Sequence, residues 1–184
     1  MISRDEAIRF LYENIKSENM RRHCYASEAV MKALAKRLGE DEGEWGMAGL
    51  LHDIDVEITL ADPKTHGLYA VKMLEGKVSA EVIDSIAMHN EVATQKIRET
   101  KFQHALAAGE TITGLITATA LIYPDKKVTS VKPKSIIKRM NQKAFAASVN
   151  RESIMECEKL GIPLDEFAEL ALNAMKEVDE ILGL

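Results

Sequence analysis

Start and stop signals for α-helices recur along almost the whole chain, and they restrict the fold to one built from helices. Ser3 and Glu6 have the spacing of a capping box, which satisfies free backbone N–H groups at a helix start. Gly39 follows an apolar-patterned segment as a C-terminal stop, and Pro124 ends a long apolar one. The single alternating run, 53–57, is too short and acidic for a strand and is predicted to be a loop. The sequence therefore predicts an all-α fold.

Apolar residues at helical spacing give the approximate extent of each helix. The expected helices start at Ser3, cover 22–38, 44–52, 62–76, 79–90 and 102–123, start again at Pro133, and cover 150–161 and 164–182. The 46% apolar content suffices for a core, and no repeat or linker divides the 184 residues. We expect one compact helical bundle over residues 1–184, in which 125–134 forms a basic surface loop and about 133–184 a helical C-terminal part.

Charge and cysteine content exclude several classes of protein. The net charge of −5 argues against general nucleic-acid binding, which needs a basic surface. The first residues lack the apolar core of a signal peptide, and no stretch is long enough to span a bilayer. Cys24 and Cys157 are far apart and fit no metal-ligand spacing. We therefore expect a cytoplasmic protein that does not bind membranes.

Histidines gather in the first half of the chain, which holds His23, His52, His66 and His89. Each has apolar neighbours at helical spacing, and Asp53 directly follows His52. Imidazole and carboxylate together form the usual mixed ligand set of a catalytic transition metal. Adjacent residues on a helix point about 100° apart, so His52 and Asp53 can share an ion only near a helix end. The pattern indicates a metal site built from several helices.

These residues, in this order, resemble the HD-domain superfamily of metal-dependent phosphohydrolases, and within it the HDIG-like subgroup. Its signature is an upstream His, a His-Asp doublet and a distant Asp on a later helix, and His23, His52 and Asp53 match the first elements. The segments 64–70 and 87–90 resemble those that carry two further histidines in members with a second metal. The resemblance covers about 21–123 and implies an all-α fold.

The chain departs from this signature at its last element. The best match to the distant Asp is Glu110, whose extra methylene changes the reach of its carboxylate. Asp125 lies beyond Pro124, outside the expected helix, and is the weaker alternative. A carboxylate in the apolar helix around Glu110 needs a partner, which a metal ion, a lysine or an arginine could supply.

The resemblance implies a phosphohydrolase with one or two divalent ions, drawn from Mn, Fe, Co, Ni and Mg. Asp53 is the expected catalytic residue, since it can bind an ion and orient the attacking water. The expected partner is a small phosphorylated molecule, with a nucleotide as one candidate, and the oligomeric state is open. Two alternatives are a non-hydrolytic helical binding or signalling module and a di-iron oxygenase. The expected metal ligands are His23, His52, Asp53 and Glu110 for the first ion, and His66 and His89 for a second ion or for the substrate phosphate.

Three basic residues downstream, Lys138, Arg139 and Lys143, are candidates for contacts with the substrate phosphate. Asp55 and Glu57 follow the His-Asp doublet and could support a ligand or act as a general base. Exposed loop acids are the commoner case, and we expect that role for both. His104 has no partner in any pattern, and we expect it to be structural.

Overall fold

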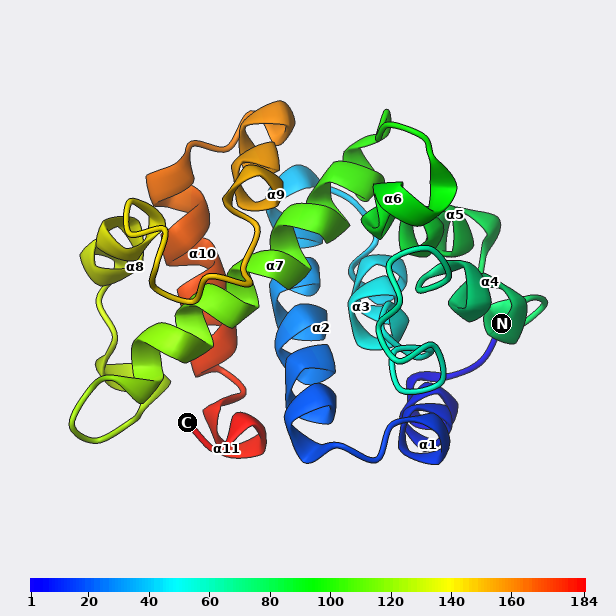
Figure 1. Cartoon of the computed structure of the whole chain (residues 1–184), viewed down its shortest axis with the longest axis horizontal. Coiled ribbons are helices and arrows are strands. Elements are labelled where there is room, and N and C mark those ends of the chain that lie inside the picture. Colours follow the sequence, from blue (N-terminus) through cyan, green and yellow to red (C-terminus); the bar gives the residue numbers. More distant parts are fainter.

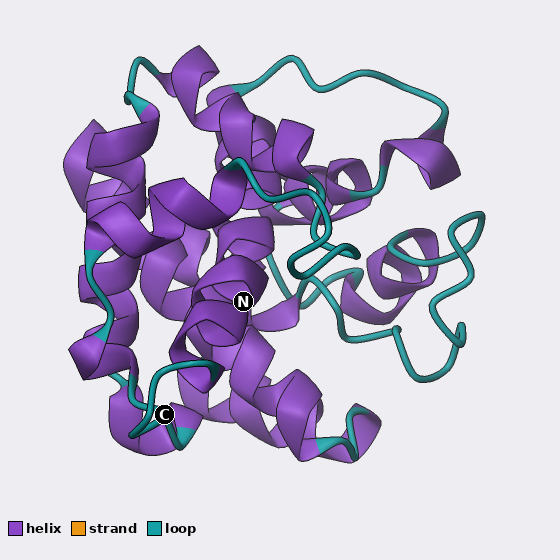
Figure 2. Ribbon diagram, turned by 60° about the vertical axis from the view of Figure 1, so that its left-hand side comes forward, coloured by secondary structure: helices purple, strands orange, loops and turns teal.

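The computed structural model describes all 184 residues and contains helices, turns and loops but no strand (Figure 1, Figure 2). The predicted all-α class is confirmed. The α-helices are α1 (Arg4–Asn14), α2 (Glu18–Leu38), α3 (Glu42–Leu51), α4 (Leu68–Leu74), α5 (Ala80–His89), α6 (Glu91–Thr94), α7 (Lys101–Leu121), α8 (Pro133–Met140), α9 (Arg151–Met155), α10 (Leu164–Lys176) and α11 (Asp179–Leu182). Two 3-10 helices, η1 (Val128–Ser130) and η2 (Glu156–Leu160), complete the chain.

Local capping explains where the main helices begin. The Ser3–Glu6 capping box opens α1 as predicted, and Thr100 with Gln103 forms a second one at the start of α7. Ser17 caps α2 and Asp41 caps α3, so these helices begin four and two residues earlier than the apolar pattern indicated.

The two 21-residue helices, α2 and α7, form the centre of the molecule. They pack against each other, and α2 also contacts α3 on one side and α10 on another (Figure 1). Buried apolar side chains from Ala7 to Leu182 form one continuous cluster. None of the helices is apolar over a long enough stretch to cross a bilayer.

The helix predicted at 62–76 is wrong in its first part, because residues 62–67 are turns and α4 covers only Leu68–Leu74. The amide nitrogen of Asn90 donates to the carbonyls of Pro63 and His66, and Asp55 accepts from the backbone N–H of Gly67. Gly67 has φ +89°, and a Cβ there would lie 3.1 Å from the His89 ring. Contacts with distant residues therefore replace the expected helical turn.

The C-terminal helices are more broken than predicted. Asn150 does cap a helix, but α9 ends at Met155 and continues as the 3-10 helix η2. The long helix expected at 164–182 is interrupted at Val178, which separates α10 from α11. Its predicted apolar stripe is still buried at Phe167, Ala171, Met175 and Leu182.

Candidate metal centre

Four histidines and one aspartate from different parts of the chain converge at one end of α3. His23 lies on α2, His52 is the C-terminal cap of α3, and Asp53 follows it. His66 lies in the turn before α4, and His89 is the last residue of α5. His52 is completely buried, while the side chains of Asp53, His66 and His89 are 11%, 14% and 6% exposed.

The two carboxylate oxygens of Asp53 face two separate pairs of imidazoles. Its Oδ2 lies 3.5 Å from His23 Nε2 and 3.4 Å from His52 Nε2, and these two nitrogens are 3.1 Å apart. Its Oδ1 lies 3.1 Å from His66 Nε2 and 3.7 Å from His89 Nε2, which are 3.0 Å apart. Each group could hold one metal ion, and Asp53 belongs to both. Both groups combine imidazole with carboxylate, the mixed ligand set that suits divalent transition metals.

The other ring nitrogen of each histidine already has a partner in the protein. His52 Nδ1 lies 2.9 Å from the Gly49 carbonyl, and His89 Nδ1 contacts the Ile86 carbonyl. His66 Nδ1 lies 2.7 Å from Asp55 Oδ1. A carbonyl or carboxylate can only accept, so each Nδ1 carries the proton, and each Nε2 can present a lone pair to a metal.

His23 has the same tautomer through a hydroxyl group. Thr113 Oγ1 lies 2.6 Å from the Glu110 carbonyl and 3.0 Å from His23 Nδ1. A hydroxyl has one proton, which it donates to the carbonyl, so its oxygen accepts the N–H of His23. All four Nε2 atoms are thus available to bind a metal, and the donor set fits divalent transition ions.

In the metal-free protein, each pair of imidazoles consists of one easily protonated ring and one that resists protonation. Burial lowers the pKa of His66, but hydrogen bonds with Asp53 and Asp55 outweigh it and raise this pKa to about 10. Burial and the charge of His52 lower the pKa of His89 to about 4. His23 likewise has its pKa lowered to about 4 by burial and by the charge of His52. Burial also lowers the pKa of His52, but the charge of Asp53, its hydrogen bond and the charge of Glu110 together raise it.

Glu110 lies at the edge of this cluster. Its Oε2 is 3.8 Å from His23 Nε2, and its Oε1 accepts a hydrogen bond from the Thr111 hydroxyl. Burial raises the pKa of Glu110 to about 7. The structure brings it beside the first pair of imidazoles but outside both compact ligand groups, so its role as a direct or water-mediated ligand stays a prediction.

Comparison with protein families agrees with this geometry. A family model described as HD domain matches residues 20–120, more than half of the 184-residue chain. The chain belongs to the HD domain family. The matched range contains all four clustered histidines, Asp53 and Glu110, and HD domains bind divalent metals. No curated protein and no solved structure matches the chain.

The cluster opens into a cleft of about 410 Å³. The HD segment supplies the floor through His23, Asp53, His66 and His89. Thr111 and Gly114 of α7 line one side. Another side comes from residues beyond the family match: Ser148, Val149, Asn150 and Ser153.

The predicted phosphate contacts Lys138, Arg139 and Lys143 are not among the residues that line this cleft. The Arg139 guanidinium instead stacks on the Phe145 ring, 4.6 Å from its centre, and donates to Gln142. Lys138 and Arg139 lie on α8, which packs on α7 and α10, and Lys143 follows the end of this helix.

The expectation that Asp55 is an exposed loop acid is wrong. It is fully buried and accepts hydrogen bonds from His66 Nδ1 and from the backbone N–H groups of Gly67 and Ala70. Burial raises its pKa, but these bonds together lower it. Asp55 therefore positions His66. Its position two residues after Asp53 indicates that it lies near the cluster, but the sequence does not show that its carboxylate contacts His66.

Sequence reasoning also missed Thr113, which has no motif around it and reaches His23 only because α2 and α7 pack together. Glu57 accepts hydrogen bonds from the backbone N–H groups of Lys16 and Ser17, and so supports the start of α2. His104 is buried against Glu156, with its Nδ1 2.8 Å from Oε2, outside the cluster as expected. Cys24 is also buried and belongs to neither ligand group.

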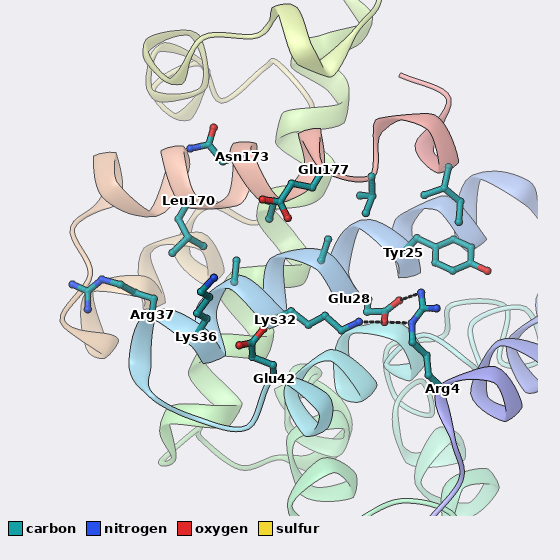
Figure 3. A pocket seen from close by; sticks show the side chains of 15 residues that line it. Arg4, Tyr25, Glu28, Lys32, Lys36, Arg37, Glu42, Leu170, Asn173 and Glu177 are labelled. Carbon is teal, nitrogen blue, oxygen red and sulfur yellow. Dashed lines mark hydrogen bonds and ion pairs between the residues drawn. The ribbon is translucent and has the colours of Figure 1, made fainter.

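A second cavity, of about 550 Å³, lies between α2 and the α10–α11 region (Figure 3). Its central charges satisfy one another. The Glu28 carboxylate accepts from Arg4 and from Lys32, at 2.5 Å to each. This cavity contains none of the four clustered histidines and no group of three metal-ligand atoms, so the ion cluster around Glu28 has a structural character.

Proposed function

We propose that this HD domain is a metal-dependent phosphohydrolase that acts on a small phosphorylated molecule. The observation that carries the proposal is Asp53, whose two oxygens face two separate pairs of imidazole Nε2 atoms. His23, His52 and Asp53 would hold one divalent ion, with Glu110 beside it, and Asp53, His66 and His89 would hold the other.

Two ions held in this way would polarise phosphoryl oxygens and lower the pKa of a water that attacks phosphorus. The protein's own groups make the site rigid. Asp55 fixes the ring of His66, and backbone carbonyls fix His52 and His89. Asp53 is the catalytic residue of the proposal, because it contacts both positions and would align the attacking water between them.

The decisive experiment measures metal content and hydrolysis in the same preparations. The chain is purified without added metal and its metal content is determined by elemental analysis. It is then assayed on p-nitrophenyl phosphate with Mn, Fe, Co, Ni or Mg. We expect about two ions per chain and hydrolysis with at least one of these metals, and we expect His52→Ala to lose both while it keeps its helical circular-dichroism signal.

Each alternative has its own result in this experiment. Bound metal with no hydrolysis of any phosphate ester would contradict the proposal and favour a non-hydrolytic module. Bound iron with the absorption of a bridged di-iron centre, together with oxygen consumption, would favour an oxygenase. Full hydrolysis by His52→Ala would mean that the reaction takes place at another site.

A further inference from the structure

The cleft wall beyond the HD segment is held in a fixed shape by Arg151. Its terminal nitrogens donate to the carbonyls of four residues in the preceding loop: Gln142, Phe145, Ala146 and Val149. Asn150 stays beside them because its Oδ1 accepts from the backbone N–H groups of Glu152 and Ser153 and so caps α9. These contacts fix the shape of the loop at 142–150, which contributes Ser148, Val149 and Asn150 to the wall of the cleft.

The wall also fits closely against α7. Gly114 lines the cleft next to Val149, and a Cβ on this glycine would lie 3.2 Å from Val149 Cγ2. The absence of a side chain at Gly114 therefore lets the loop approach the helix that carries Glu110. The wall and the metal cluster face the same space.

Several polar groups of this wall have no partner in the protein. The hydroxyls of Ser148 and Ser153 make no hydrogen bond, and the amide nitrogen of Asn150 is free because only its oxygen is used in the cap. Across the cleft, Asn90 uses its amide nitrogen on Pro63 and His66, which leaves its oxygen free to accept. The cleft thus offers both donors and acceptors, the combination that a hydroxylated ligand can satisfy.

The charge of the cleft limits the number of phosphates that it can take. Its lining contains no lysine or arginine. Two divalent ions less the charges of Asp53, Asp55 and Glu110 leave a net charge of about plus one, which one phosphomonoester already neutralises. A triphosphate would place further charge against a wall with nothing to neutralise it.

We infer that this chain is selective for the monophosphate ester of a small polyhydroxylated alcohol, such as a sugar, and that the wall formed by Ser148, Asn150 and Ser153 recognises its hydroxyl groups. This inference rests on the proposed function. The metal cluster would bind the phosphate, and residues outside the family match would select the alcohol. Diphosphates and triphosphates are then poor substrates.

The test compares kcat/KM of the metal-loaded protein for ribose phosphate, p-nitrophenyl phosphate and ATP. We expect ribose phosphate to exceed ATP by roughly a hundredfold. Replacement of both wall serines, Ser148→Ala with Ser153→Ala, should lower kcat/KM for ribose phosphate roughly thirtyfold, since two hydrogen bonds of about 1 kcal/mol each are lost. The loss for p-nitrophenyl phosphate, whose alcohol carries no further hydroxyl group, should be much smaller, so the ratio of the two kcat/KM values should fall. Ser130→Ala, outside the cleft, should leave both values unchanged.

A variant that gains activity shows an effect that loss of folding cannot produce. Ser148→Lys adds the missing cation to the wall and should raise the ratio of ATP to ribose phosphate turnover about tenfold. Equal or better use of ATP by the parent protein, or an equal loss on both esters in the double serine variant, would overturn the inference while the proposed function stands. Bound metal without hydrolysis of p-nitrophenyl phosphate would instead overturn the proposed function.

Discussion

The two buried carboxylates Glu28 and Asp53 are surrounded by different kinds of side chain. Glu28 on α2 is surrounded by cations that the protein itself supplies, because Arg4 and Lys32 both reach it (Figure 3). Asp53 is surrounded by imidazoles whose Nδ1 atoms are already committed to other partners and whose Nε2 atoms all face inward. Both carboxyl groups have a lowered pKa although burial opposes it, yet only Asp53 lies among ligand atoms that could hold a metal ion.

The difference shows how a binding site can be told from a structural ion cluster. A structural cluster satisfies its charges within the chain, so nothing further is required for its stability. A binding site holds its ligand atoms in place with a second layer of hydrogen bonds and leaves their lone pairs free. The cavity beside Glu28 is larger than the metal cleft, at about 550 Å³ against 410 Å³, so volume alone would have identified the wrong one.

The largest expected effect is that of Asp53→Ala. Both proposed ions share this carboxylate, so the variant should lose both of them and reduce hydrolysis by more than about a thousandfold. Metal content and kcat are the measurements, and circular dichroism should show unchanged helix content. Retention of both ions would mean that Asp53 is not the bridge.

Asp55→Asn should weaken only one of the two ion positions. It removes the charge that holds the Nδ1 proton of His66, and loss of such a partner costs roughly 10- to 100-fold in metal affinity. Titration with Mn²⁺ should therefore resolve two binding positions, one with unchanged affinity and one with lowered affinity. Thr113→Val, on the His23 side, should weaken the other ion by a smaller factor, because a neutral hydroxyl is lost. An equal loss at both positions in either variant would contradict this division of the cluster.

Metal affinity should rise with pH. The pKa of His66 is about 10 in the metal-free protein, so at neutral pH an ion must displace the proton that His66 holds. Affinity at that position should increase about tenfold per pH unit up to that value. Calorimetry in buffers of different ionisation enthalpy should detect roughly one proton released for this ion. If the ion binds without release of a proton, His66 does not exchange its proton for the ion.

Glu110→Gln should weaken the first ion by about tenfold, less than Asp53→Ala, since Glu110 lies at the edge of the cluster. Its pKa of about 7 means that the carboxyl group loses its proton as pH rises through neutrality. The affinity for the first ion should therefore increase over that range. The variant should lose this part of the pH dependence, and Glu110→Asp should keep it. Unchanged affinity in Glu110→Gln would exclude the carboxylate as a ligand.

Glu28→Gln should have the smallest effect on the metal and none on activity, while it lowers the free energy of unfolding. Its partners are half-exposed, so the loss should be about 2 kcal/mol, between the values for exposed and buried pairs. The folded-state pKa of Glu28 is below its ordinary 4.5, so this stabilisation is present above that pH and is lost as pH falls through the folded pKa. Urea denaturation over a series of pH values from neutral into the acid range should show the difference shrink as pH falls. A loss of bound metal in this variant would remove the distinction between the two clusters.

Local signals in the sequence predicted the helical class and most helix starts. Ser3, Ser79 and Asn150 cap helices as expected, because a cap is a contact between residues two or three apart. The same signals failed at 62–67, where Asp55 and Asn90 take the backbone groups that a helix would have used. For Lys138, Arg139 and Lys143 the sequence shows the charge but not where these side chains lie relative to the cleft, whose lining does not include them.

The sequence by itself determined the family, the helices and the residue types that gather at the metal cluster, since each is encoded by spacing over a few residues. Only the tertiary structure decided that Asp53 presents one oxygen to each pair of imidazoles. It alone brought Asp55 to His66 and Thr113 to His23, and it added a cleft wall from residues beyond the HD segment. The reason is physical: a cap forms within one turn of chain, whereas the convergence of ligand atoms from α2, α3, α5 and the turn before α4 depends on how the apolar faces of those helices pack.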